Sequence, residues 1–121
     1  MRKLVTLVLI LSSYLSHSNE IIGNITGNWH GQIEVMGSKL RISFHITQED
    51  NVYITTMDSP DQGGFDIPTT STNFENNNLV ISMKTIGAEY KGELKDTSIE
   101  GIFSQAGMKM ELILNRNKIT H

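Results

Sequence analysis

Apolar and polar residues alternate with a period of two along most of the chain. The clearest stretch runs from Lys39 to Thr47, where every second residue is large and apolar. The inward-facing residues of this stretch are Leu40, Ile42, Phe44 and Ile46. Because successive side chains of a β-strand point to opposite faces, the pattern predicts a strand with one buried face. A polar break at Gln48–Asn51 and a second run at Val52–Asp58 predict that this strand continues into a hairpin.

The same alternation returns at regular intervals, with turn residues between the runs. Further strands are predicted at residues 29–35, 79–84, 88–94, 99–103 and 108–114, with a more weakly specified one at 69–74. The short segment 65–68 ends at Pro68, which cannot donate to a ladder, so we expect an edge or a loop crossing there. Strands that recur about every ten residues, without a helical period, indicate an all-β sandwich or barrel. Because the connections are short and long open edges invite aggregation, we predict a single antiparallel meander that closes into a small barrel of about eight strands.

Large aromatic side chains fall on the inward faces of the predicted strands. They are Trp29, Phe44, Tyr90 and Phe103. A small β-domain needs large apolar side chains in its core, so packing is favoured over ligand stacking for all four. Three methionines, at positions 83, 108 and 110, also point inward, and methionine serves both as a gap filler and as a lining for adaptable surfaces. For a chain of this size we expect side chains to fill the interior.

The N-terminus has the layout of a secretory signal peptide. A basic start precedes a short apolar run, Leu4–Leu11, and a small polar segment, Ser12–Ser18. The apolar run is shorter than the ~20 residues that a membrane span requires, so we favour a cleaved signal peptide over an uncleaved anchor. The chain has no cysteine, so its domain relies on a hydrophobic core rather than on disulfides. We therefore predict a secreted or periplasmic protein with a signal peptide at 1–18, a β-domain at 24–116 and a polar tail at 117–121.

Charge and site chemistry narrow the classes of function. The net charge is −3 and spread out, whereas nucleic-acid binders need clustered Lys and Arg, so we predict no nucleic-acid partner. His30 and His45 both face outward on adjacent predicted strands, but the sequence supplies no third zinc ligand at a recognisable spacing. The spacing of Asp58, Asp61 and Asp66 does not match a calcium loop, so we expect no metal. No G-x-S-x-G elbow occurs and no pair of carboxylates stands out, so we predict no catalytic residues, no cofactor and no enzyme.

The densest cluster of turn residues follows the predicted hairpin, at Ser59–Gly64. Pro60 fixes one backbone angle there, and two glycines permit positive φ. The loop is longer than a hairpin needs, and loops on a rigid scaffold often carry binding residues. The candidate binding residues are Asp58, Ser59, Asp61 and Gln62. The alternative interpretation is that this loop has a structural role alone.

Several short motifs resemble those of known families. Gly27-Asn28-Trp29 and Arg116 resemble the lipocalin-like (calycin) barrels, in which such an Arg packs on the Trp. A longer resemblance, over residues 24–116, is to the N-terminal, non-catalytic β-domain of secreted bacterial α/β-hydrolases of the serine aminopeptidase type. Its most specific motif is Asp58–Gly63, and the other matching segments are 27–31, 40–46, 67–68, 90–94, 99–107 and 112–116.

The two resemblances imply different functions. The hydrolase resemblance implies an accessory or binding module whose partner is a hydrolase domain. The lipocalin resemblance implies a small carrier of a hydrophobic ligand. In the hydrolase family a catalytic domain with its own Ser, Asp and His follows the β-domain, and no such set follows residue 116 here. We therefore expect a non-catalytic module, either a stand-alone copy of the accessory domain or the remnant of a truncated hydrolase gene.

Overall fold

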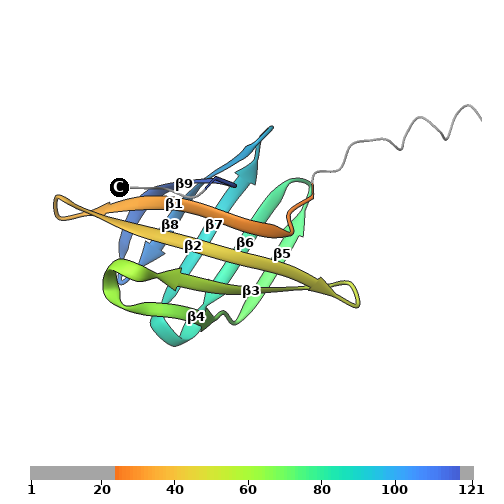
Figure 1. The fold of residues 1–121 in the computed structure, drawn as a ribbon, viewed down its shortest axis with the longest axis horizontal. Helices are drawn as coiled ribbons and strands as arrows, with labels where there is room; N and C mark the ends of the chain where they lie inside the picture. Colours follow the sequence, from red (N-terminus) through yellow and green to blue (C-terminus); the bar gives the residue numbers. More distant parts are fainter. Residues whose placement is uncertain (1–23, 118–121) are drawn as a thin grey trace, which may run out of the picture.

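The computed structural model describes residues 24–117, which form one sheet of nine β-strands and two short 3₁₀ helices (Figure 1). The strands are β1 (Gly27–Val35), β2 (Ser38–Glu49), β3 (Val52–Ser59), β4 (Gly64–Pro68), β5 (Ser71–Glu75), β6 (Asn78–Met83), β7 (Ala88–Leu94), β8 (Ser98–Gln105) and β9 (Met108–Asn115). The 3₁₀ helices are η1 (Pro60–Gln62) and η2 (Lys84–Ile86). Across these described residues there is no helix with the length and hydrophobicity that crossing a membrane requires. The predicted signal peptide at 1–18 and most of the predicted tail lie outside the described residues.

The strands form a single antiparallel meander, which confirms the fold predicted from the alternation. Their spatial order is β4-β3-β2-β1-β9-β8-β7-β6-β5, so the first and last strands are neighbours and β4 and β5 lie at the two ends of the sheet. Figure 1 shows the sheet curling round into a half-barrel. The sheet has one strand more than the eight predicted, and this additional strand is β4, the segment expected to be an edge or a crossing. It pairs with β3 alone, with a register shift between Met57 and Ser59, so Pro68 at its end sits where a missing N–H is tolerated.

The two ends of the sheet meet without a ladder. In place of a β4–β5 pairing, the chain around β5 lies against β3. The Thr69 N–H donates to the Thr55 carbonyl at 3.3 Å, and the hydroxyl oxygens of Thr55 and Thr72 are 2.7 Å apart. Thr55 and Thr72 are both buried. The curled sheet is therefore held at this seam by a few local hydrogen bonds instead of by strand pairing.

The aromatic core lies where the alternation predicts it. Trp29, Phe44, Tyr90 and Phe103 are each exposed by 2% or less. The rings of Phe44 and Tyr90 meet across the barrel, with centroids 5.6 Å apart. The Tyr90 hydroxyl donates to the carbonyl of Leu112 at 2.9 Å, and burial raises the pKa of this phenol. Aromatic packing thus joins strands from opposite sides of the sheet.

The barrel has two unlike ends, which are defined by where the turns fall. The open end carries the turns at 36–37, 60–63, 84–87 and 106–107. The closed end carries the turns at 50–51, 76–77 and 95–97, together with residues 24–26 and Arg116. The Arg116 guanidinium lies over the Trp29 ring, 4.0 Å from its centroid, and donates to the carbonyls of Asn24 and Thr26. These contacts tie both termini of the domain together and seal the closed end.

Candidate functional site

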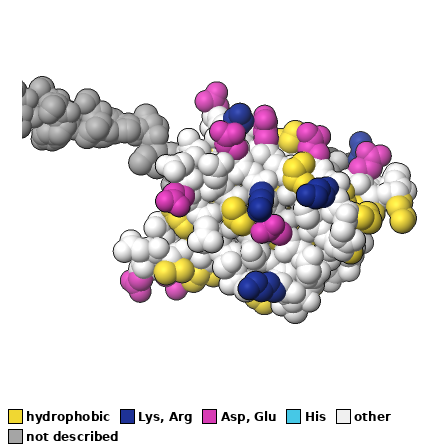
Figure 2. Space-filling model, turned by 180° about the vertical axis from the view of Figure 1, so that it is seen from behind, with side chains coloured by type: hydrophobic (Ala, Val, Ile, Leu, Met, Phe, Trp, Pro, Cys, Tyr) yellow, Lys and Arg dark blue, Asp and Glu magenta, His cyan; other side chains and the backbone are white. Residues whose placement is uncertain are grey.

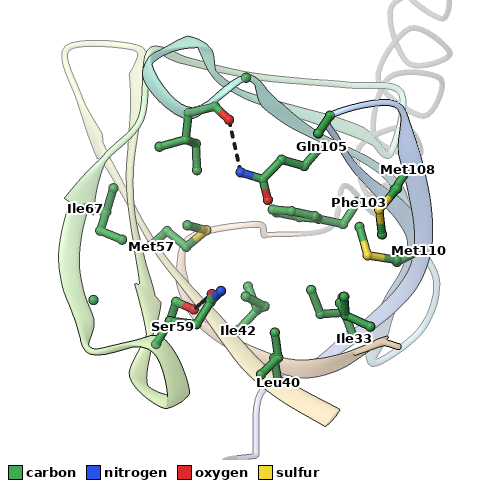
Figure 3. A pocket seen from close by; sticks show the side chains of 16 residues that line it. Ile33, Leu40, Ile42, Met57, Ser59, Ile67, Phe103, Gln105, Met108 and Met110 are labelled. Atoms are coloured by element: carbon green, nitrogen blue, oxygen red, sulfur yellow. Dashed lines mark hydrogen bonds between the residues drawn. The ribbon is translucent and has the colours of Figure 1, made fainter. Parts of the chain in front are cut away.

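A cavity of about 720 Å³ lies inside the barrel at its open end (Figure 3). Strands from both sides of the sheet and the turns η1 and η2 line it. Its lining residues are Ile33, Val35, Leu40, Ile42, Met57, Ser59, Gln62, Gly64, Ile67, Ile86, Gly87, Phe103, Gln105, Ala106, Met108 and Met110. Most are inward positions of their strands, so the alternation that builds the core also makes the walls of the cavity apolar.

The cavity contradicts the expectation that side chains fill the interior. Of the four core aromatic residues only Phe103 lines it, because Trp29, Phe44 and Tyr90 fill the rest of the barrel. At the open end the inward side chains are aliphatic residues, methionines and glycines, which reach less far across the barrel. In addition, β4 and η2 lie beside the seam where β4 and β5 are not paired, so no strand–strand hydrogen bonds hold these two walls close to each other. The expectation fails because alternation predicts direction and says nothing about the distance between opposite walls.

The loop after β3 places two of the four predicted binding residues on the outside. Asp58 accepts a hydrogen bond from the Asp66 backbone N–H at 2.8 Å, and its other oxygen lies 2.9 Å from His45 Nε2. Asp61 accepts from the Arg41 backbone N–H at 2.8 Å and from the Arg41 guanidinium at 2.7 Å. These bonds fasten the loop to β2 and β4, and neither aspartate lines the cavity. The contacts of both aspartates agree with the structural interpretation of the loop.

The other two predicted residues, Ser59 and Gln62, do line the cavity. Ser59 is 3% exposed, and its hydroxyl donates to Gln62 Oε1 at 2.5 Å. The helix η1 sets this geometry: Pro60 begins it, and Gly63, with a φ of 75°, ends it with an N–H bond to the Pro60 carbonyl at 3.0 Å. A left-handed residue is needed at that point, and glycine adopts it without strain. The turn chemistry of the loop therefore positions Gln62 at the mouth of the cavity.

Gln105 and the apolar walls lie outside the binding residues predicted from sequence. Gln105 ends β8, and its Nε2 donates to the Ile86 carbonyl at 3.0 Å (Figure 3). The sequence signal for the walls is the methionines, because methionine often lines adaptable apolar surfaces. Met57, Met108 and Met110 all line the cavity.

The two histidines are held by neighbouring polar groups, and His30, expected to face outward, is buried with 9% of its surface exposed. His30 Nδ1 lies 2.7 Å from the Ser43 hydroxyl. His45 lies between Asn28 Oδ1, at 2.7 Å, and Asp58 Oδ2, at 2.9 Å, so both of its ring nitrogens are engaged. Within residues 24–117, no three His, Cys, Asp or Glu side chains are grouped so as to hold a metal ion. Neither His45 nor Asp58 lines the cavity, so this pair does not face a molecule bound there.

An Asp58→Asn variant should be less stable than the wild type at neutral pH but not in acid. Burial, the largest influence, pushes the pKa of the Asp58 carboxyl up. Hydrogen bonds from His45 and the Asp66 N–H, with the charges of His45 and His30, nevertheless hold that pKa below its ordinary value. A carboxylate with a lowered folded-state pKa stabilises the fold fully above its unfolded-state pKa of about 4, and loses that contribution as the pH falls through the folded value. We expect the variant to lose about 1 kcal/mol of unfolding free energy at neutral pH, with the difference from wild type shrinking toward zero in acid.

Urea unfolding followed by circular dichroism across an acid-to-neutral pH series measures this difference. Asp96→Asn, in the exposed turn between β7 and β8, is the matched control because it removes the same charge. A deficit for Asp58→Asn that stays constant across the series would show that the carboxylate charge contributes nothing to the contact.

No protein-family model, curated protein or solved structure matches the chain. The packing of Arg116 on Trp29 is the contact that the lipocalin resemblance implies. The Asp58–Gly63 motif of the hydrolase resemblance forms a loop that is bonded within itself and to β2. Both resemblances stay predictions, so the cavity is the feature on which a function can be based.

Proposed function

We propose that the protein is an exported, non-catalytic β-barrel module that carries a small hydrophobic ligand in the open end of the barrel. The cavity is the observation that supports this: of its sixteen lining residues, eleven are apolar and none is charged. Its volume of about 720 Å³ lies within the range of roughly 300–1,000 Å³ that small-molecule sites occupy. Export is part of the proposal because residues 1–18 have the layout of a signal peptide.

Water is a poor occupant for walls of this kind. Side chains such as Ile33, Leu40 and Ile42 offer water no hydrogen-bond partner, and apolar surface left in water costs about 25 cal/mol per Å². A hydrophobic molecule removes both its own surface and these walls from water. The outer surface is different: on the face shown in Figure 2, hydrophobic side chains lie singly or in small groups among charged ones. On that face apolar surface is therefore scattered, whereas in the cavity it is gathered into continuous walls.

A Met110→Trp variant should block the cavity without unfolding the protein. Met110 lines the cavity from β9 and is paired with Phe103 on the neighbouring strand β8. An indole at this position occupies space that a ligand would need. We expect the dissociation constant for an uncharged, environment-sensitive naphthylamine dye to rise by about tenfold or more, because overlap with a bound molecule removes its contacts. Dye fluorescence during titration gives the constant, and a thermal melt checks the fold.

Glu111→Trp is the matched control. Glu111 is the next residue of β9 and lies exposed on the outer face, so the same indole there leaves the cavity empty. If the wild type binds the dye and both variants bind it equally well, the dye binds elsewhere and the proposed site is wrong. Absence of binding to the wild type would count against a carrier function.

An accessory role beside a hydrolase domain is a second proposal, and the loop after β3 favours it. Phe65 lies in β4, two residues after the Asp58–Gly63 motif, and is 62% exposed beside a loop that is fastened to β2. A large exposed aromatic side chain next to a rigid loop is typical of a protein contact. Esterase and peptidase assays on the chain alone address both proposals, because turnover by the isolated chain would overturn a non-catalytic role.

A further inference from the structure

We infer that the ligand is an uncharged amphiphile whose apolar body fills the cavity and whose head group, at the mouth, both donates and accepts a hydrogen bond. Gln62 and Gln105 are the residues that would hold this head group. The inference rests on the proposed carrier function and names the class of ligand for that site.

Charged head groups find no partner in the walls of the cavity. None of the lining residues is charged. The nearest ion pair of the loop, Arg41 with Asp61, lies on the outside and is bound through the guanidinium at 2.7–3.2 Å. Moving a carboxylate or an ammonium group against apolar walls without an opposite charge loses hydration that nothing replaces. Ionised ligands are therefore disfavoured.

Among the described residues, the two glutamines of the lining leave a donor group free on Gln62 and an acceptor oxygen free on Gln105. The Ser59 hydroxyl donates to Gln62 Oε1, which leaves the NH₂ group of Gln62 as a donor. The Gln105 NH₂ group donates to the Ile86 carbonyl, which leaves Gln105 Oε1 as an acceptor. Within residues 24–117 neither of these remaining groups has a partner. Each glutamine is thus oriented by one bond and presents its other end at the mouth.

The donor and the acceptor come from opposite walls of the barrel. Gln62 belongs to the loop after β3, beside Ser59, whereas Gln105 ends β8. Figure 3 shows Ser59 and Gln105 on opposite sides of the cavity. A hydroxyl or a primary amide has both a donor and an acceptor and matches this pair. A carboxylate only accepts, an ammonium only donates and a hydrocarbon end does neither.

A matched series of dodecyl compounds tests this inference. Dodecanol, dodecanamide, dodecanoate and dodecylammonium share one apolar body, so competition against the naphthylamine dye at neutral pH isolates the head group. We expect dodecanol and dodecanamide to bind about tenfold more tightly than either ion, because the neutral heads keep their hydrogen bonds and the ions lose hydration.

A Gln62→Glu variant should change the preferred head group. The substitution keeps an oxygen that can accept from Ser59, but it replaces the donor NH₂ with a second carboxylate oxygen. We expect dodecylammonium to gain about tenfold in affinity and dodecanol to lose affinity. Gln48→Glu is the control, since Gln48 is an exposed residue toward the other end of β2 and acquires the same charge away from the cavity.

The outcomes separate this inference from the proposed function. Equal affinity for all four compounds, or an equal response of both variants, would overturn the head-group assignment while leaving a hydrophobe carrier in place. Tighter binding of dodecanoate or dodecylammonium to the wild type would also overturn it. Failure of the wild type to bind the dye and every compound would overturn the carrier function itself.

Discussion

A Gly101→Val variant is expected to lose most of its folding stability. Gly101 of β8 faces Gly92 of β7 in the ladder. A Cβ on Gly101 would lie 2.6 Å from the Gly92 Cα and 2.7 Å from the Tyr90 Cζ, and closer still to the Lys91 carbonyl oxygen. Two of these three neighbours are backbone, so the strain cannot be relieved by turning a side chain. We expect the free energy of unfolding to fall by about 3 kcal/mol or more, out of the roughly 5–15 kcal/mol that a domain of this kind has.

The cause is the position of the Tyr90 ring. The ring lies against the Gly92–Gly101 pair, and from there its hydroxyl reaches the Leu112 carbonyl on β9. Side chains on either glycine would push the ring away and leave that buried carbonyl without its partner, at a cost of about 1–3 kcal/mol. The glycines thus let three neighbouring strands curl around one aromatic residue.

Urea unfolding followed by circular dichroism measures the loss. Gly37→Asn is the control because Gly37 lies in an open turn with a φ of 83°, which asparagine tolerates, and no atom lies within 4 Å of the added carbon. We expect that variant to unfold close to the wild type. A Gly101→Val protein with wild-type stability would mean that β7 and β8 are not as close as the structure places them.

The fold follows from sequence to the extent that its signals are local. The period of two predicts which residues of β2 point inward, and Phe44 and Ile46 are buried as expected. The segment that became β4 has a weaker signal, because it is short, ends at Pro68 and pairs on one side alone. Its status as a strand depends on β3 being available beside it, which is a tertiary property.

The site follows from sequence in part. Of the four binding residues predicted from sequence, Ser59 and Gln62 line the cavity, whereas Asp58 and Asp61 do not. The sequence of β3 begins with three apolar residues in a row, so it does not show which side of this strand faces inward. The Ser59-Pro60 turn signal correctly marks a fixed loop. The cavity itself is not visible in the sequence, since its width depends on how strongly the sheet curls and on the unpaired seam between β4 and β5. Gln105 gains its role only when β8 is placed across the barrel from that loop.

Trp29→Ala is expected to lower the free energy of unfolding by about 3–5 kcal/mol, as truncation of a fully buried aromatic residue does. Trp29 is 0% exposed, and its Nε1 donates to the Ile25 carbonyl at 2.9 Å. Arg116 covers the other side of the ring and donates to two carbonyls near the N-terminal end of the domain. The indole therefore supports both Ile25 and Arg116, which belong to the closed end of the barrel.

A double-mutant cycle with Arg116→Met separates the stacking from the packing. Arg116→Met should cost about 1–2 kcal/mol alone, because it loses the cation–π contact and two charge-assisted hydrogen bonds but keeps part of the apolar stem. If the guanidinium acts through the ring, the loss in the double variant should be smaller than the sum of the single losses by about 1 kcal/mol. Strict additivity would show that Arg116 and Trp29 stabilise the closed end independently. Ligand binding adds a further test, because Arg116 lies at the end of the barrel away from the cavity. Arg116→Met should lower the stability and leave the affinity for the dye unchanged. A loss of affinity would mean that the two ends of the barrel are coupled.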